Sequence, residues 1–326
     1  EGWVRDAARR FVVREDPIDG HLVRRYRPRI EGLFARIERW TNATTGDAHW
    51  RSISRDNVTT VYGPDNDSRI FDPADPNQAH PTRIFSWLIS HSYDDKGNAI
   101  VYEYKPEDSQ RVPTNTLHEK NRTERSRTVN RYLKRIKYGN RASRLIQLDL
   151  SRAEWLFELV FDYEDHDPIK PTPGDDGLPW AARQDPFSSY RSGFEVRTYR
   201  LCQRVLMFHH FPDPDGTGAG YDGLVRSTDF TYSYEENKDD ARNPIYSFLK
   251  SVTQTGFKLR DDGTYLSKSL PPLQFHYSEP QVSSEVRTID ATSLENLPYG
   301  IDGASFQWLD LDGEGLSGVL AEQAEG

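Results

Sequence analysis

Residues 83–104 read RIFSWLISHSYDDKGNAIVYEY, two apolar segments rich in aromatic rings that are separated by a short polar turn. Segments 83–92 and 99–104 have the length and the β-branched and aromatic content of strands. Between them lies YDDKGN, in which Gly97 and Asn98 can adopt positive φ at little cost. The stretch therefore predicts two antiparallel strands joined by a tight turn.

The same strand–turn–strand pattern recurs along the chain. Residues 32–40 (GLFARIERW) alternate apolar and polar positions, and the following TNATTGD supplies turn residues. Further strands are expected at residues 49–53, 58–62, 132–140, 154–163, 194–208, 227–234, 248–257 and 273–277. Loops rich in Pro, Gly and Asp are expected at residues 63–81, 165–184 and 212–223. One short helix is expected, at residues 2–10, so the predicted fold is all-β, with antiparallel hairpins and sheets joined by long loops.

The composition fits a β-rich domain and argues against a dedicated nucleic-acid partner. Aromatic residues make up 12% of the 326 residues, and large rings suit half-buried sheet faces. The formal charge of -9 is unfavourable for contacts with phosphates. One basic stretch, residues 111–144, could form an electrostatic patch for nucleic acid or lipid. A polar loop followed by a strand with solvated charges is the favoured interpretation, because acidic runs elsewhere balance it.

The single cysteine, Cys202, excludes an intrachain disulfide and a zinc site built on cysteines. It lies in an apolar run, residues 201–211, and is expected in the core. No run of 18 apolar residues predicts a membrane span, and no signal-peptide pattern opens the sequence. The first residue is Glu1 and the only methionine is Met207. We therefore expect the sequence to be an internal piece of a longer protein.

Residues 162–167 (DYEDHD) place His166 among carboxylates, as a metal or hydrolytic site would. Neighbouring strand residues point in alternating directions, however, so a solvated turn is the favoured interpretation. His209 and His210 end a strand, one expected toward the core and one toward solvent, and a ligand role is disfavoured. The sequence contains no Gly-x-Ser-x-Gly elbow, Walker loop or His-Glu-x-x-His motif. No catalytic or cofactor-binding residue is predicted.

Residues 308–320 (WLDLDGEGLSGVL) contain alternating carboxylates in a glycine-rich turn between apolar strands. Asp310, Asp312 and Glu314 are therefore candidates for a calcium site. The motif is not an EF-hand, because the twelfth position is Ala321 and no flanking helices are evident. It fits the short turn of an FG-GAP or VCBS β-propeller blade better, although Gly318 stands where that family usually has Asp. Hydrogen bonds of the Asx type and glycine alone could also hold the turn.

Several stretches, in order along the chain, resemble one family. They include RRYRPRIEGLFARIERW, HWRSISRDNVTTVYG, DPADP, FSWLISHSYDDKGNAIVYEY, NRYLKRIKYGNR, DPFSSYRSGFEVRTYRLCQRVLMFHHF, LVRSTDFTYSY and SLPPLQFHYSE. Together with residues 293–320 they look like the N-terminal region of the B subunits of insecticidal toxin complexes (the TcaC and TcdB group) and of the virulence-plasmid protein SpvB. The resemblance covers nearly the whole chain.

That resemblance implies an SpvB-like β-rich shell region at residues 1–290 and the start of an FG-GAP-like β-propeller at 291–326. In such toxin complexes, Rhs/YD repeats follow and form, with the C subunit, a cocoon around an unfolded toxin, while the propeller docks on the A-subunit pore. The implied partners are therefore the C subunit and the A-subunit pore, with no nucleic acid and no direct membrane insertion. A secreted location is expected, with no export signal visible.

Two other functions remain open. In SpvB the ADP-ribosyltransferase activity belongs to a separate C-terminal domain with a Glu-x-Glu turn. Here Glu322 and Glu325 are three apart and lack the accompanying segments, so the chain is expected not to be an enzyme, although a catalytic domain could lie outside it. A carbohydrate- or receptor-binding β module is suggested by the many Trp and Tyr residues, which burial in a core would also explain.

Overall fold

The structure, a computed structural model, divides into two compact units, Glu1–His276 and Tyr277–Gly326. The predicted boundary at residue 290/291 lies beyond this division. The structure describes residues 3–5, 11–13, 16–30, 32, 34–174, 177–211, 213, 220–233, 247–278, 285–286, 288, 290–292, 295, 306–310 and 318–321.

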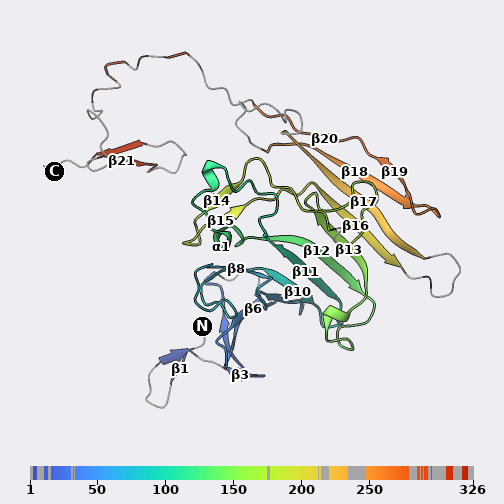
Figure 1. Cartoon of the computed structure of the whole chain (residues 1–326). Coiled ribbons are helices and arrows are strands. Elements are labelled where there is room, and N and C mark those ends of the chain that lie inside the picture. Colours follow the sequence, from blue (N-terminus) through green and yellow to red (C-terminus); the bar gives the residue numbers. More distant parts are fainter. Residues whose placement is uncertain are drawn as a thin grey trace. The chain divides into compact units, whose positions relative to one another are not determined.

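Among the described residues of the first unit, one antiparallel sheet contains fourteen strands (Figure 1). The order of the strands is β19-β18-β17-β16-β13-β12-β11-β10-β7-β6-β5-β4-β3, and β20 pairs with β18. Their bounds are β3 Asp16–Ile18, β4 His21–Tyr26, β5 Arg36–Asn42, β6 Ala48–Ile53, β7 Thr59–Tyr62, β10 Ile89–Tyr93, β11 Ala99–Pro106, β12 Arg131–Asn140, β13 Trp155–Asp162, β16 Arg204–Phe211, β17 Tyr221–Tyr232, β18 Leu249–Leu259, β19 Tyr265–Ser269 and β20 Leu273–Gln274. The all-β prediction is confirmed.

Smaller elements accompany this sheet. Separate antiparallel hairpins pair β1 (Trp3–Arg5) with β2 (Phe11–Val13), β8 (Arg69–Phe71) with β9 (Ile84–Trp87), and β14 (Phe187–Ser189) with β15 (Val196–Thr198). The described helical turns are short: η1 (Leu117–Glu119), α1 (Glu124–Arg127) and η2 (Leu150–Arg152).

The turn between β10 and β11 forms as the sequence predicts. Gly97 has a φ of 85°, and its amide donates to the carbonyl of Asp94 at 3.2 Å. The Asp94 carboxylate accepts from the amides of Lys96 and Asn98, at 3.0 and 2.8 Å. The aspartate therefore closes the turn from inside, and glycine supplies the left-handed conformation.

Four predictions about single segments are wrong. Residues 83–92, expected as one strand, form two strands, β9 and β10, of which β9 pairs with β8 and β10 pairs with β7 and β11. Instead of a helix at residues 2–10, Trp3–Arg5 is a strand, while residues 6–10 lie outside the described part of the chain. The loop expected at residues 63–81 contains strand β8, and β17 begins at Tyr221, inside a loop expected to reach residue 223. In each case, pairing with another strand overrides a weak local signal in the sequence. Strand β1, for example, forms because it pairs with β2.

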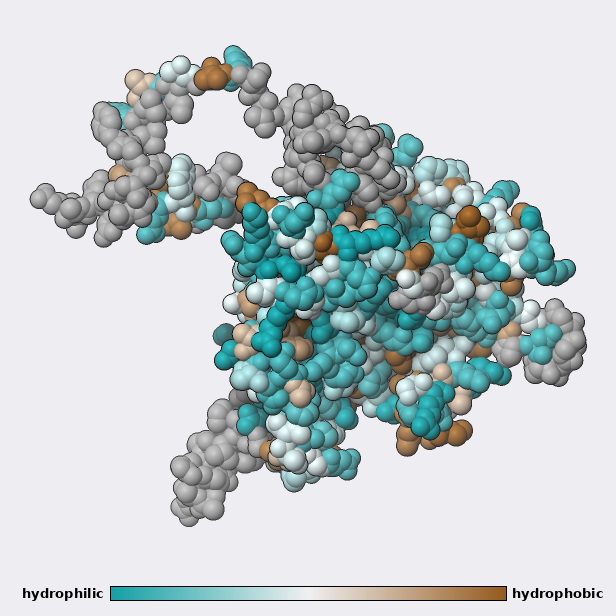
Figure 2. All heavy atoms as spheres, in the orientation of Figure 1, coloured by the Kyte–Doolittle hydropathy of each residue, from teal (hydrophilic) through white to brown (hydrophobic). Residues whose placement is uncertain are grey.

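Among the described residues of the first unit, two clusters of buried hydrophobic side chains lie on and beside the C-terminal strands of the sheet. Val160, Leu206, Phe208 and Leu224 come from three neighbouring strands, and each is at most 1% exposed. The second cluster is aromatic and is made of Tyr132, Tyr163 and Trp180. Burial of each large apolar side chain contributes about 1.5–3 kcal/mol. Around these clusters, the described surface in Figure 2 is predominantly hydrophilic.

Candidate functional site

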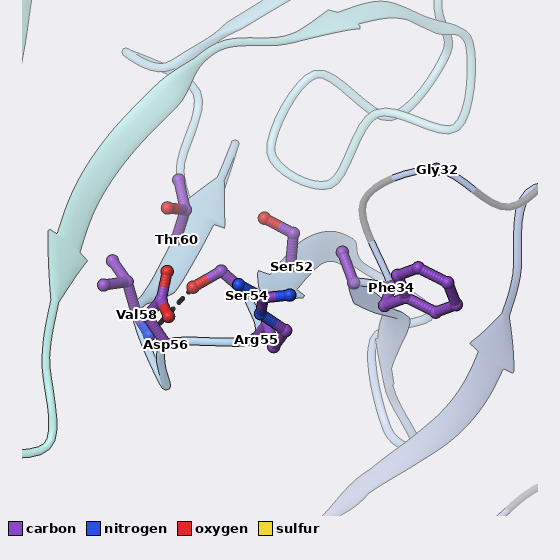
Figure 3. A pocket seen from close by; sticks show the side chains of 9 residues that line it. Gly32, Phe34, Ser52, Ser54, Arg55, Asp56, Val58 and Thr60 are labelled. Carbon is purple, nitrogen blue, oxygen red and sulfur yellow. Dashed lines mark hydrogen bonds between the residues drawn. The ribbon is translucent and has the colours of Figure 1, made fainter.

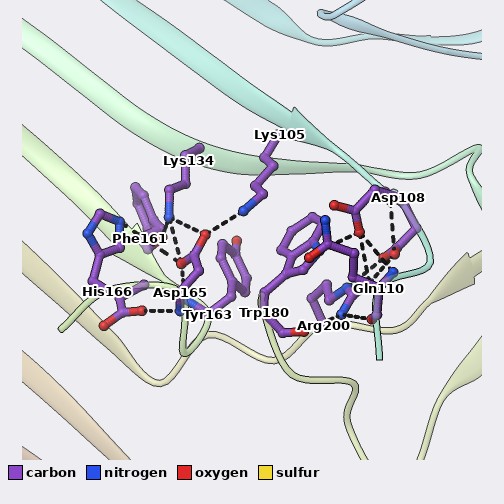
Figure 4. A network of polar contacts seen from close by, with 12 residues as sticks. Lys105, Asp108, Gln110, Lys134, Phe161, Tyr163, Asp165, His166, Trp180 and Arg200 are labelled. Carbon is purple, nitrogen blue, oxygen red and sulfur yellow. Dashed lines mark hydrogen bonds and ion pairs between the residues drawn. The ribbon is translucent and has the colours of Figure 1, made fainter. Parts of the chain in front are cut away.

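The turn that follows β13 lies in the interior of the first unit. The sequence predicts a solvated turn at residues 162–167, and this is wrong: Asp162, Asp165 and His166 are only 1%, 0% and 3% exposed. Positively charged side chains from distant parts of the chain reach into the turn and compensate its carboxylates (Figure 4). These cations, which residues 162–167 alone do not reveal, are what permits burial.

Asp165 is the centre of this ion-pair network. Its two carboxylate oxygens each lie 2.7 Å from Nζ of Lys134, on β12. Oδ2 also lies 2.7 Å from Nζ of Lys105, on β11, and Oδ1 accepts from the amide of Tyr163 at 3.1 Å. Lys134 is only 3% exposed and the Lys105 side chain 18%, so the network ties two strands to the turn with largely desolvated contacts.

The charges of this network determine the ionisation of Asp165. Burial by itself would raise its pKa, but the ammonium groups of Lys134 and Lys105 outweigh that effect and hold the pKa below its ordinary value. Asp162 is neutralised separately by Arg204, whose Nε donates to it. Asp162 also accepts from the amide of Asp165 at 3.0 Å, so the two carboxylates are joined through the backbone.

Trp180 connects this network with a second one. The indole is fully buried, and Nζ of Lys105 and Cζ of Arg200 lie 4.3 and 4.2 Å from its ring centroid. Its Nε1 donates to Oδ1 of Asp108 at 2.6 Å. The ring thus lies within cation–π distance of two charges, a contact strengthened by the absence of water.

Arg200 forms the second network with Glu107. Both side chains are fully buried and make a two-pronged ion pair, with Nε 2.9 Å from Oε2. The remaining Arg200 nitrogen donates to the carbonyls of Gln110 and Trp180, each at 2.9 Å. One guanidinium therefore fixes two long loops that are far apart in the sequence.

Part of the basic stretch at residues 111–144 is paired internally, whereas Arg111, Lys120 and Arg125 are exposed, as the prediction of solvated charges has it. Glu119 is 1% exposed and accepts from Nε of Arg197 at 3.0 Å and from the hydroxyl of Tyr199 at 2.7 Å. Arg122 contacts Glu195 at 2.7 Å. These bonds hold the loop that contains η1 and α1 against the β14–β15 hairpin.

These networks have a structural role. Their carboxylates accept hydrogen bonds from cationic side chains and backbone amides, and these bonds fix loops to the sheet. Nowhere in the described parts of the chain do three or more His, Cys, Asp or Glu side chains form a group that could hold a metal ion. Over the same residues, no helix is long and apolar enough to cross a membrane.

Comparison with known proteins connects this architecture to a family. Residues 4–211 match the family described as SpvB, the Salmonella virulence plasmid 65kDa B protein, and this is more than half of the chain. The chain belongs to the SpvB family. The match ends at Phe211, the last residue of β16, and contains every residue of the ionic networks described above.

Relatives of this SpvB-family chain include a mono(ADP-ribosyl)transferase. The chain is 38% identical over 224 residues to the mono(ADP-ribosyl)transferase SpvB of Salmonella typhimurium, a match that covers 67% of this chain and 35% of the relative. The chain therefore spans about a third of the length of that curated protein. The structure of the N-terminal domain of effector protein SpvB from Salmonella typhimurium LT2 is similar with a TM-score of 0.60 and 34% identity, covering 73% of this chain and 70% of that domain.

Toxin-complex structures match a larger part of the chain. The crystal structure of TcdB2-TccC3-Cdc42 is similar with a TM-score of 0.69 and 30% identity, over 99% of this chain and 15% of the other. The Photorhabdus luminescens Tc holotoxin pore gives a TM-score of 0.67 and 30% identity, over 96% of this chain and 14% of the other. The similarity of this SpvB-family chain therefore extends to Tc toxin components.

The acidic turn predicted from the sequence lies in the second unit. The SpvB-family chain has there two of the expected elements, β21 (Phe306–Leu309) antiparallel to β22 (Gly318–Ala321), with Trp308 opposite Val319, while residues 311–317 lie outside the described part of the chain. Asp310 is exposed and directly follows β21. Asp312 and Glu314 lie outside the described residues.

A cavity of about 510 Å³ lies beside β6 and β7 in the SpvB-family sheet (Figure 3). The ring of Phe34 is 69% exposed at this cavity, and its φ is 52°. Three hydroxyls that line the cavity are bonded within the protein: Ser52 with Tyr62, Thr60 with Ser92, and Ser54 with the amide of Val58. These internal bonds compete with a polar ligand.

The remaining candidates of the SpvB-family chain lie on or near β16. Cys202 is partly buried against the aromatic core cluster, and burial raises its pKa to about 12. His209 packs edge-on against Phe157 and Phe211, with ring centroids 5.1 and 5.3 Å away. His210 points to carboxylates instead, with Nδ1 2.6 Å from Asp222. Both histidines are half-buried, so the expected split between core and solvent is only partial.

Proposed function

We propose that this chain is a non-catalytic structural segment of a toxin-complex B subunit, which together with a C subunit forms a shell around a toxic cargo. The observation that carries the proposal is the similarity to TcdB2-TccC3 over 99% of the chain. That similarity continues past residue 211, where the SpvB match ends, into β17–β20 and the second unit. The buried ion pairs support the same role, because they make a rigid sheet rather than an accessible site.

We assign residues 1–290 to the SpvB-like shell region and residues 291–326 to the start of an FG-GAP-like propeller. The paired strands β21 and β22 support the second assignment. By the resemblance, the propeller docks on the A-subunit pore, and the similarity to the Tc holotoxin pore supports partners of this kind. The location that follows is outside the producing cell, as part of a delivered toxin.

A segment exchange tests the shell role. This chain would replace the matching N-terminal segment of TcdB2, and the chimera would be co-expressed with TccC3. We expect the two to co-elute and to protect the cargo region of TccC3 from protease. A deletion of the same segment is the matched control and should leave the cargo open to cleavage. A folded chimera that binds TccC3 but protects no better than the deletion would contradict the shell role.

We propose in addition that the acidic turn after β21 either binds calcium through Asp310, Asp312 and Glu314 or is held by hydrogen bonds and glycine. Crowded carboxylates disfavour such a turn unless a cation or amides compensate them. Calorimetric titration with calcium distinguishes the two. Heat of binding that disappears in Asp310→Ala indicates a calcium site, whereas no heat in either protein indicates a turn held by hydrogen bonds.

A further inference from the structure

Three histidines lie among arginines and aromatic rings in the half of the sheet that contains β4–β7 and β10. His49, on β6, stacks on Trp40 of β5, with ring centroids 6.1 Å apart and planes at 23°. His21, on β4, meets the His49 ring edge-on at 5.8 Å. His91, on β10, stacks on Tyr93 at 6.1 Å. None of these rings belongs to the ionic networks around Asp165 and Arg200.

One hydrogen bond fixes the protonation state of His49. Nε of Arg51 donates to Nε2 of His49 at 3.1 Å. A guanidinium has donors only, so Nε2 must supply the lone pair and the proton of the neutral ring must be on Nδ1. The same guanidinium lies over the Trp40 ring, 3.6 Å from its centroid. A proton on Nε2 would remove the acceptor and leave two cations in contact.

The groups around His49 would do little to stabilise a protonated, positively charged ring. Burial, followed by the charges of Arg51, His21 and Arg69, lowers the pKa of His49 to about 4, and only Asp47 opposes them. Asp47 already makes two bonds to Arg69, at 2.7 and 3.1 Å.

The next carboxylate along the sheet is also occupied. Glu38, on β5, accepts from Nε1 of Trp40 at 3.0 Å and contacts the guanidiniums of Arg25 and Arg36.

His91 is in a similar environment. Burial and the charges of Arg144 and Arg51 lower its pKa to about 4, against a weaker opposite effect of Asp65. Arg144 lies over Tyr93 at 3.7 Å from the ring centroid. Two histidines are thus held neutral on neighbouring parts of one sheet by the same arginine-rich layer.

We propose that the His49–Arg51 pair is an acid-sensitive lock on β5–β7: protonation of His49 breaks the bond from Arg51, displaces that guanidinium from Trp40 and loosens the sheet. The sign follows from linkage. The folded chain binds this proton more weakly than the unfolded chain does. The stabilisation is therefore complete above about pH 6.5, the ordinary value for histidine, and is lost as the pH falls toward 4. A sheet built in this way is firm at neutral pH and weakened in an acidified compartment.

Two measurements on the 326-residue chain test the lock. Nitrogen-15 NMR of the histidine rings at pH 7 should show His49 as the neutral Nδ1–H tautomer, and an Nε2–H tautomer or a charged ring would overturn the proposal. In urea unfolding, His49→Gln keeps an acceptor for Arg51 but cannot titrate. Between pH 7 and pH 4.5 the wild-type folding constant should fall by on the order of 50-fold more than that of His49→Gln.

The exposed His276 provides the matched control. His276→Gln should lose as much stability in acid as the wild type, because its ring lies outside the arginine-rich layer. If His49→Gln loses as much as His276→Gln does, the lock does not exist. The NMR result decides the question even if the His49 variant does not fold.

Discussion

Replacing Gly97 by alanine tests how the β10–β11 turn is built. A Cβ atom at Gly97 would lie 2.0 Å from Oγ of Ser143 and 3.0 Å from the amide nitrogen of Arg144. The left-handed φ of 85° costs about 1 kcal/mol for alanine. The clash would also disrupt two hydrogen bonds of 2.9 Å, one from the Ser143 hydroxyl to the Lys96 carbonyl and one from the Arg144 amide to the Gly97 carbonyl. Each contributes about 1 kcal/mol to the free energy of unfolding. The expected loss of unfolding free energy is therefore about 2–4 kcal/mol.

Gly46 supplies the matched control for this variant. It has nearly the same φ, 74°, but no atom within 4 Å of its virtual Cβ. Gly46→Ala should therefore lose only about 1 kcal/mol. Both values come from urea unfolding followed by circular dichroism. Equal losses at the two positions would refute the claim that the loop at 143–145 packs onto the turn.

Three further predictions concern the ionic core and the chemistry. Asp165→Asn should lose about 3–5 kcal/mol in urea unfolding because it leaves Lys134 buried without a counter-charge, whereas the exposed Asp261→Asn should stay within about 0.5 kcal/mol. The pKa of Asp165 is lowered, so the difference in unfolding free energy between Asp165→Asn and the wild type should be constant from pH 7 to about pH 5 and shrink below about pH 4. A difference that already shrinks near pH 6 contradicts the ion pair. The purified chain should neither hydrolyse NAD nor transfer ADP-ribose, and turnover abolished by Glu322→Ala or Glu325→Ala would refute the scaffold role.

The strands could be predicted from the sequence because their signals are local. The alternation around residues 32–40 and the YDDKGN turn depend only on neighbours in the chain, and β5, β10 and β11 form there. Strands β8 and β14 are only three residues long, which is too short for a periodic pattern to indicate a strand. The hairpin of β1 and β2 depends on pairing between two strands, which the prediction of a helix at residues 2–10 did not take into account.

The buried charges could not be predicted from residues 162–167 by themselves. Asp165 is paired with Lys134 and with Lys105, which is 60 positions away, and only the fold brings them together. A partial signal was present at Lys134, because it alternates with Tyr132 and Ile136 along its strand, whereas the strand of Lys105 also contains Glu103. Charged side chains inside such strands need a partner, and the nearest unexplained carboxylates follow the next strand.

The most direct test of the shell role is a cryo-EM structure of the chimera of this chain and TcdB2 bound to TccC3. We predict that β3–β20 form part of the wall around the cargo space, with Asp165 still paired with Lys134. A wall that closes without these strands, with the segment projecting freely from the complex, would contradict the proposed function.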